Sequence, residues 1–374
     1  MILNRLSLIV ASLVLVIVVF GLAGPRAALL VLVGIGFGLA LEGLRFGFAG
    51  PWRVMITEKD GRGLVAQLLA IGLTAAVAIP LLASAPGELI GAHAPIGLAM
   101  IAGAFVFGAA MQLVMGCGSG TLVNAGSGNL IGAVALVGFI AGSFLGTLHL
   151  DWWTGLGALP TLTMQGIAGA NGGLALTLVG LAAIAALVIF RSAPGKKMPP
   201  RRLWIAAIVI ALLAIGNLVV AGQPWGVVYG LGLWGAKIAQ AGGMDLAANA
   251  FWSGPVHAER LSQSILTDYT SLTNIGLIFG AFLVMRWRAP VGDQVKRLKF
   301  ESWAVILIAG LVLGYSARIA FGCNVGAFFS GISTGSLHGW VWFAAAFVGS
   351  GVGLKLRPVL LQPMKPPVGE GQPA

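Results

Sequence analysis

Charge is scarce in this sequence. Only 9% of its 374 residues are Asp, Glu, Lys or Arg, whereas 58% are hydrophobic. A soluble domain carries roughly 25% charged residues, so this chain cannot cover itself with a water-compatible surface. The shortage argues against a soluble enzyme or binding module. Alternating short strands are lacking too, which argues against a membrane barrel. An all-α polytopic membrane protein remains.

Cysteine is almost absent as well. The two cysteines, Cys117 and Cys323, lie in apolar, Gly-rich surroundings, so a structural disulfide framework is not expected. Two thiols alone do not complete a tetrahedral zinc shell, and the chain has no CxxC, quinone or haem signature. We therefore expect no metal, no cofactor and no catalytic residues.

The basic residues explain the net charge of +11 through topology rather than through nucleic acid. Lys and Arg gather in short loops, which is typical of cytoplasmic loops of an inner-membrane protein. These loops are 50–62, 191–202 and 286–299, together with the tail after Lys355. Stretches 84–95 and 149–172 carry no Lys or Arg and are predicted to be external. Both termini are then predicted to be cytoplasmic.

Eleven apolar segments approach the ~20 residues that cross a bilayer. The first is predicted to be a retained helix, because no convincing signal-peptide cleavage site follows it. We divide the chain into an N-terminal half (1–190, with a first repeat at 27–148), a basic linker (191–202), a C-terminal half (203–355, the second repeat) and a disordered tail (356–374). The segments are 6–23, 27–48, 64–83, 96–114, 130–148, 173–190, 204–222, 225–241, 271–286, 302–320 and 338–354.

The two halves resemble each other. Coincidence among 57 glycines is the alternative, but the only two cysteines fall on equivalent positions. At an offset of 206, Gly108, Gly116, Cys117, Gly120 and Ser127 match Gly314, Gly322, Cys323, Gly326 and Ser333; at 207, Gly142, Ser143 and Gly146 match Gly349, Ser350 and Gly353. A weaker match at an offset of 192 pairs Gly34, Gly38 and Gly50 with Gly226, Gly230 and Gly242.

The basic loops predict that the repeats are inverted. Segment 96–114 runs inward and its equivalent 302–320 runs outward, an arrangement common in transporters. Segments 27–48 and 225–241 would however run the same way. Either one of 204–222 and 225–241 is therefore re-entrant, or the segment boundaries are misplaced.

Each cysteine lies where glycines interrupt an apolar helix. Irregular backbone at membrane depth survives only inside protein or around a water-filled cavity, and its free N–H groups suit an anion. Paired breaks in matching halves point to a transport site near the midplane. Each cysteine alone has a plainer reading as a small buried hydrophobe. The predicted pathway residues are Cys117 with Gly116, Gly118 and Gly120, and Cys323 with Gly322, Asn324 and Gly326.

Intramembrane charge adds further candidates. Arg318 lies five residues before Cys323, and its equivalent Gln112 lies five before Cys117. A charge inside a bilayer normally faces a partner or a pathway, so both are assigned to the pathway. Arg45 and Lys237 are secondary candidates, with snorkelling to an interface as the alternative.

These residues resemble the YeeE/YedE family of sulfur-transport membrane proteins. The resemblance rests on the stretches 116–120, 316–327 and 331–340 and covers most of 27–355. It implies an inner-membrane protein whose re-entrant Gly-rich loops meet at a constriction. It further implies thiosulfate uptake with Cys117 and Cys323 as relay thiols, and a small sulfur-carrier protein of the TusA type as a candidate partner.

One departure from the family keeps alternatives open. Thiosulfate importers of the family carry a further cysteine after an aromatic-rich stretch, and the comparable stretch 45–50 has none. We therefore predict an importer of an inorganic sulfur anion, with thiosulfate first. A selenium or other sulfur species is the alternative substrate. A membrane thiol redox protein and a partner-anchoring subunit are the alternative functions.

Overall fold

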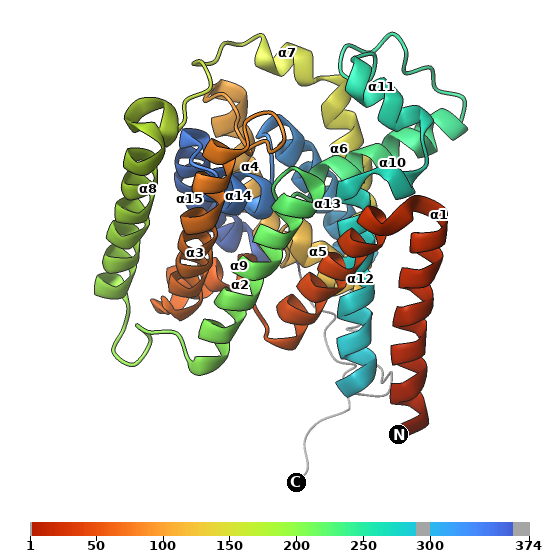
Figure 1. Cartoon of the computed structure of the whole chain (residues 1–374). Helices are drawn as coiled ribbons and strands as arrows, with labels where there is room; N and C mark the ends of the chain where they lie inside the picture. Colours follow the sequence, from red (N-terminus) through yellow and green to blue (C-terminus); the bar gives the residue numbers. More distant parts are fainter. Residues whose placement is uncertain (1, 289–299, 362–374) are drawn as a thin grey trace.

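The structure is a computed structural model that describes residues 2–288 and 300–361, with side chains from residue 5 on. The described chain is a bundle of helices with only isolated β-bridges between loops (Figure 1). The elements are α1 (Ile2–Gly43), α2 (Ala49–Glu58), α3 (Arg62–Ser84), α4 (Leu98–Val114), α5 (Gly118–Gly126), α6 (Leu130–Leu148), α7 (Leu150–Thr154), α8 (Met164–Arg191), α9 (Arg201–Ala221), α10 (Val228–Ala241), α11 (Pro255–Ser262), η1 (Ile265–Thr267), α12 (Tyr269–Arg288), α13 (Phe300–Ile319), η2 (Asn324–Phe329), α14 (Ser330–Ser333) and α15 (Leu337–Leu360).

Nine helices of the described chain are long and apolar enough to cross a membrane, which confirms a polytopic all-α membrane protein. The first of them, α1, is broken at Gly24 into two helical arms. Gly24 has a φ of 84°, Pro25 follows it, and the second arm turns back beside the first (Figure 1). The arms correspond to the predicted segments 6–23 and 27–48, although the second ends at Gly43.

Two short helices correct the predicted topology. Helix α10 has 14 residues and so rises ~21 Å, too little for a hydrocarbon core of ~30 Å. Helix α9, with 21 residues, is long enough. By length, segment 225–241 is therefore the one that we expect to be re-entrant. Residues 50–58, predicted to lie in a loop, instead belong to α2, whose Trp52 is fully buried.

Helix packing is reciprocal between the chain's two halves. Helix α4 packs on α15 while α6 packs on α13, and α1 packs on α12 while α3 packs on α9. Glycines make the close contacts: Gly142 lies against the carbonyl of Leu311, and Gly349 against that of Phe105. Those two contacts exchange under the offsets of 206 and 207 found in the sequence. A twofold axis would produce this pattern; the inverted relation itself stays a prediction.

The weaker match at an offset of 192 is wrong as a structural equivalence. It pairs the second arm of α1 with α10. In the packing, α10 contacts α12 and α6 in the way that α2 contacts α3 and α15. The short α2 is thus the counterpart of α10, and the second arm of α1 corresponds to α9. A glycine-rich composition produced the false match, because small residues recur on every closely packed helix here.

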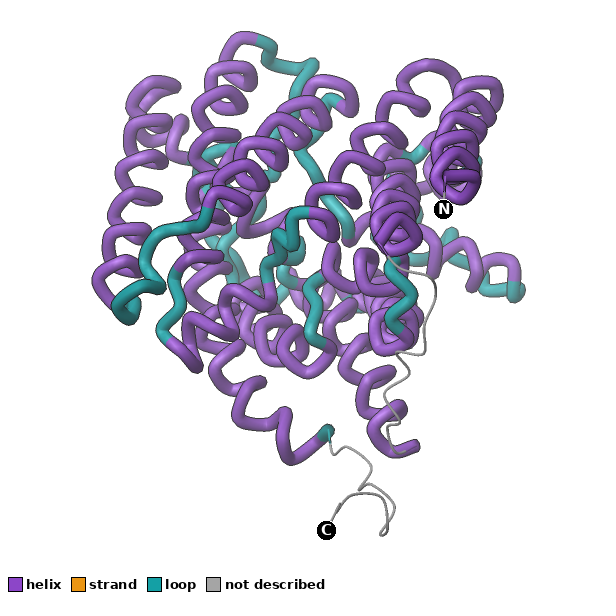
Figure 2. The backbone as a smooth tube through the Cα atoms, turned by 90° about the horizontal axis from the view of Figure 1, so that it is seen from below, coloured by secondary structure: helices purple, strands orange, loops and turns teal. Residues whose placement is uncertain are grey.

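The connections gather on two faces. The loop before α3 and the basic linker after α8 lie together, since Ala193 donates to the carbonyl of Lys59 and Lys196 pairs with Glu58 at 2.9 Å. Helices α7 and α11 lie across the opposite end (Figure 1). Seen from below, loop segments also interrupt the helices in the middle of the molecule (Figure 2).

Helix ends can be compared with the predicted division, which itself stays a prediction. Helix α8 ends at Arg191 and α9 begins at Arg201, so residues 192–200 connect two helices. The tail predicted to be disordered from residue 356 is helical up to Leu360. Its remainder, 362–374, and most of loop 286–299 lie outside the described residues.

Candidate functional site

Two helix breaks of the same conformation form the centre of the molecule. Met115 ends α4 and Phe321 follows α13, and both have a φ of 58°. A non-glycine residue in this left-handed region costs roughly 1–2 kcal/mol, and such strain concentrates at functional sites. The backbone bonds match pairwise: Gly116 N–H to Met111 O (3.2 Å) with Gly322 N–H to Ala317 O (2.9 Å), and Thr121 N–H to Cys117 O with Ala327 N–H to Cys323 O (both 2.8 Å).

Glycine directly precedes each cysteine, where the backbone leaves little room for a side chain. Gly322 has a φ of 153°, and a methyl group on it would lie 2.7 Å from the amide nitrogen of Ala327. A methyl group on Gly116 would lie 3.1 Å from the amide nitrogen of Thr121. The chain thus folds back over the first turn of the next helix. At Gly322 only a residue without a side chain permits this, whereas at Gly116 a side chain would force its neighbours to shift slightly.

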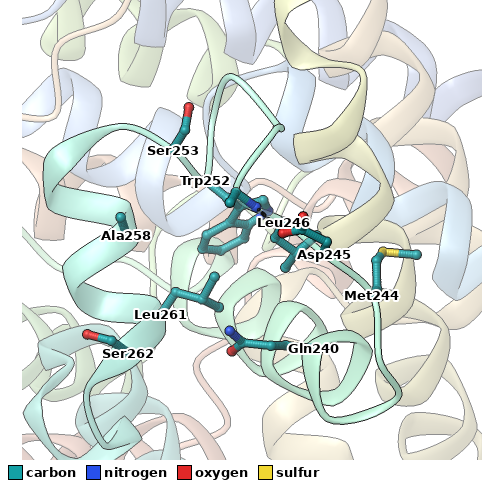
Figure 3. A pocket seen from close by; sticks show the side chains of 10 residues that line it. Gln240, Met244, Asp245, Leu246, Trp252, Ser253, Ala258, Leu261 and Ser262 are labelled. Atoms are coloured by element: carbon teal, nitrogen blue, oxygen red, sulfur yellow. Dashed lines mark hydrogen bonds between the residues drawn. The ribbon is translucent and has the colours of Figure 1, made fainter.

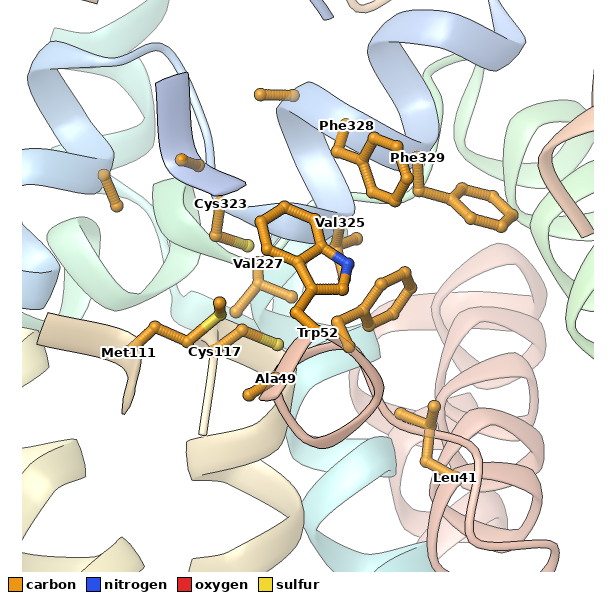
Figure 4. Packing of buried hydrophobic residues seen from close by; sticks show 14 of the residues in the cluster. Leu41, Ala49, Trp52, Met111, Cys117, Val227, Cys323, Val325, Phe328 and Phe329 are labelled. Carbon is orange, nitrogen blue, oxygen red and sulfur yellow. The ribbon is translucent and has the colours of Figure 1, made fainter. Parts of the chain in front are cut away.

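The two breaks meet. A methyl group on Gly118, the residue after Cys117, would lie 2.8 Å from the Cys323 sulfur and 3.4 Å from Val227. In Figure 4 the two thiols lie near each other, with Val227 between them. Cys117 caps α5: its sulfur accepts from the Gly120 N–H at 3.4 Å. Cys323 makes no such cap. The predicted meeting of the glycine-rich breaks is therefore present.

The meeting point is closed and contains unsatisfied polar atoms. Cys117 and Cys323 are 1% and 0% exposed. Asn324, beside Cys323, is also 0% exposed, and neither of its amide atoms has a hydrogen-bond partner. Leaving a buried polar group unpaired costs about 1–3 kcal/mol, so this amide calls for an explanation. A methyl group on Gly326, three residues after Cys323, would meet no neighbouring atom within 4 Å outside its own helix turn.

Aromatic rings that sequence reasoning missed surround the same place. Trp225 stacks on Phe37 at 3.8 Å, and Phe329 meets Trp225 edge-on at 5.8 Å. The indole N–H of Trp225 is buried without a partner. A small cavity of ≈ 10 Å³ lies beside Trp225 and Phe329. Nothing in the sequence marks these residues, because rings from three distant segments meet only in the fold.

Arg318 and Gln112 lie away from the thiols, one toward α10 and one toward α2. The Arg318 guanidinium donates to the carbonyl of Val228 at 3.0 Å and to the Ser143 hydroxyl at 3.3 Å. The Gln112 amide donates to the carbonyl of Ala49 at 3.3 Å, and its oxygen has no partner. The structure therefore does not bring the two together. They flank the centre as equivalent positions of the two breaks.

The secondary candidates are not part of this centre. Arg45 is exposed just after α1. Lys237 donates to the carbonyls of Leu261 and Gln263, and so fastens the segment after α10. Within the described residues, no three His, Cys, Asp or Glu side chains gather that could hold a metal ion. Chemistry at the centre thus rests on thiols, an amide and backbone groups.

Comparison with known proteins adds a family. A family model described as sulphur transport matches residues 44–352. The chain is 27% identical to the thiosulfate transporter TsuA of Spirochaeta thermophila in an alignment of 336 residues that covers 83% of this chain and 92% of that protein. It is 30% identical to the probable transporter YedE of Escherichia coli over 162 residues, 43% of this chain and 39% of that protein. The YedE protein of Salmonella typhimurium is 28% identical over the same shares. The chain thus spans well under half the length of the YedE proteins.

Proposed function

This chain belongs to the sulphur transport family, and on that premise we propose that it imports an inorganic sulfur anion across the inner membrane. Thiosulfate is the proposed substrate, because the relative that the chain matches over most of its length is named a thiosulfate transporter. A selenium oxyanion or another sulfur species is the alternative substrate. A small sulfur-carrier protein of the TusA type, waiting at the cytoplasmic face, is the proposed partner.

One observation carries the proposal: the two equivalent breaks meet with a cysteine each, beside an amide that has no partner. A thiol is a weak hydrogen-bond donor and a polarizable contact for sulfur. An anion held by thiols and the Asn324 amide is bound weakly enough to leave, which conduction requires. The amide N–H groups that open α5 and η2 add partial positive charge on the same side.

The pathway we propose follows the pseudo-twofold arrangement. The anion passes from Arg318 to the pair of thiols and leaves past Gln112. Reciprocal packing of α4, α6, α13 and α15 supports inverted repeats, and the basic loops on one face support cytoplasmic termini. Because both thiols are buried, this conformation is occluded, and transport requires the breaks to separate.

Uptake into proteoliposomes tests the proposal. Wild-type protein is expected to take up labelled thiosulfate in preference to sulfate, sulfite and selenite. Cys323→Ala is expected to abolish uptake while leaving a monodisperse protein, because its thiol caps no helix. Ser330→Ala, which removes a hydroxyl bonded to the carbonyl of Trp225, is the matched control near the same break. Normal thiosulfate uptake by a Cys117→Ala/Cys323→Ala protein would refute the thiol pathway.

The redox alternative has its own readout. A thiol pair that cycles would be trapped by alkylation only after reduction, whereas a transport pair is alkylated slowly with or without reductant because it is buried. Preferential uptake of selenite would keep the transporter and replace the substrate.

A further inference from the structure

An insertion distinguishes the two halves at the end of the molecule that carries α7. Helices α10 and α12 are separated by residues 242–268, which include α11 and η1, whereas their counterparts α2 and α3 are separated by Lys59–Gly61. We call residues 242–268 the cap. The cap is tied down: the Trp252 indole N–H donates to the Thr147 hydroxyl on α6 at 2.8 Å.

Arg318, beneath the cap, is a cation without a carboxylate. In the part of the chain that the structure describes, the ion pairs join Arg62 to Asp60, Lys196 to Glu58 and Arg260 to Asp268. The Arg318 guanidinium instead meets a carbonyl and a hydroxyl, and its Nε is buried with no partner. Arg318 is half-buried, and neutral partners compensate a partly desolvated charge poorly, so the site favours a negative ion.

The helices beside Arg318 leave room for it. A methyl group on Gly232 of α10 would lie 2.5 Å from the guanidinium, and one on Gly146 of α6 would lie 2.7 Å from the Arg318 Cβ. A side chain at position 146 would therefore collide with the root of the Arg318 side chain, whereas one at position 232 would displace its guanidinium. At the equivalent position of the other break stands neutral Gln112, so the cation and the cap occur together on one side only.

Aromatic rings stand where a counter-ion would be. The Arg318 Cζ lies 5.4 Å from the centre of the Phe251 ring and 5.8 Å from that of Tyr229. His257 stacks on Phe251 at 4.1 Å and bonds the Tyr229 hydroxyl at 3.0 Å. A cation–π contact is weaker than an ion pair, so these rings compensate the Arg318 charge less than an anion would.

The cap has space to move. A cavity of ≈ 310 Å³ lies between the end of α10 and α11, and Trp252 and Leu261 line it (Figure 3). Asp245 also lines this cavity, and its carboxylate disfavours an anion there. The cavity thus leaves unfilled space beside Trp252 and Ala258, the immediate neighbours of Phe251 and His257 in the chain.

We propose that Arg318 is a second anion site, distinct from the thiols, which binds a small inorganic dianion when the Phe251–His257 part of the cap swings aside. The proposal rests on the proposed function for the identity of its ligand. The anion enters the pathway at this site, from the side of α7 and α11. Its charge-assisted hydrogen bonds to Arg318 replace the contacts between Arg318 and the aromatic rings.

Thiosulfate titration of purified Cys117→Ala/Cys323→Ala protein, followed by calorimetry, isolates this site from the thiols. One bound anion per chain is expected. In that background Arg318→Gln is expected to weaken binding at least tenfold, because it removes a charged hydrogen-bond donor. Phe251→Ala is expected to tighten binding about two- to fivefold, because it removes the competing ring. Arg26→Gln is the matched control, because exposed Arg26 likewise bonds a carbonyl and covers a ring, that of Tyr269.

The outcomes separate the two proposals. Equal affinities for Arg318→Gln and Arg26→Gln would overturn the Arg318 site, as would a Phe251→Ala protein that binds as weakly as Arg318→Gln. Arg318→Lys, which keeps the charge, guards against misfolding: it should retain binding better than Arg318→Gln. A wild-type protein without thiosulfate flux in proteoliposomes would defeat the transporter proposal and leave this binding comparison intact.

Discussion

Replacing Gly349 by alanine tests the packing that brings the breaks together. On α15, Gly349 lies so close to the Phe105 carbonyl on α4 that a methyl group would overlap the oxygen. Gly351, two residues further along the same helix, has open space around it. Each substitution by alanine adds about 0.5–1 kcal/mol to the free energy of unfolding, because glycine is unfavourable inside a helix. Only Gly349→Ala also incurs the overpacking cost of about 1–3 kcal/mol.

The two variants should therefore move in opposite directions. We expect Gly351→Ala to raise the free energy of unfolding by about 0.5–1 kcal/mol. The free energy of unfolding of Gly349→Ala should be about 1–3 kcal/mol lower than that of Gly351→Ala. We expect a difference of about 3 kcal/mol, because the methyl group would meet a backbone carbonyl, which cannot move aside as a side chain can. Gly142→Ala should behave like Gly349→Ala, since it meets the Leu311 carbonyl in the equivalent contact.

Unfolding in mixed detergent with increasing SDS, followed by tryptophan fluorescence, measures these differences. Comparing variants on one helix cancels most effects on the unfolded state. If Gly349→Ala and Gly351→Ala unfold at the same SDS fraction, the close approach of α4 and α15 is refuted. If Gly142→Ala is as mild as Gly351→Ala, the reciprocity between the halves fails.

Three further results are expected. Asn324→Leu, which replaces an unpartnered buried amide by an apolar group of similar size, should keep or raise stability while lowering thiosulfate uptake; a stable variant with full uptake would show that the amide binds nothing. The hydrogen bond from the Arg62 side chain lowers the pKa of Asp60 from the usual 3.8. The ionised Asp60 therefore stabilises the fold fully above pH 3.8, and this stabilisation is lost as the pH falls through the lower folded-state pKa. The stability difference between wild type and Asp60→Asn should shrink below about pH 4 and stay constant above pH 5. In a background without Cys117 and Cys323, a membrane-impermeant maleimide added to spheroplasts should label Leu156→Cys and spare Lys197→Cys; the reverse pattern would invert the topology.

The sequence already determined that this protein lies in a membrane and that its fold is all-α. Scarce charge and repeated apolar segments leave a helical bundle as the structure that satisfies every backbone group in lipid. The cysteine-centred match at an offset of 206 located both breaks, since the close backbone turns there favour glycine at Gly116 and require it at Gly322. Family membership also followed from these motifs, and the family model confirms it.

Length and packing decided what the sequence left open. Whether 204–222 or 225–241 crosses depended on where helices end, and hydropathy does not mark the end of a helix that stays inside protein. The false match of the second arm of α1 with α10 has a related cause. Glycines indicate that a helix packs closely, but they do not indicate which helix it packs against.

The surroundings of the site also belong to tertiary structure. Its features depend on segments far apart in the chain. They are the stacking of Phe37 on Trp225, the unpartnered amide of Asn324 and the cap over Arg318. Local sequence specifies the turn that presents each thiol. Only the fold decides what that thiol faces, because burial and contact distance depend on elements that the local sequence does not contain.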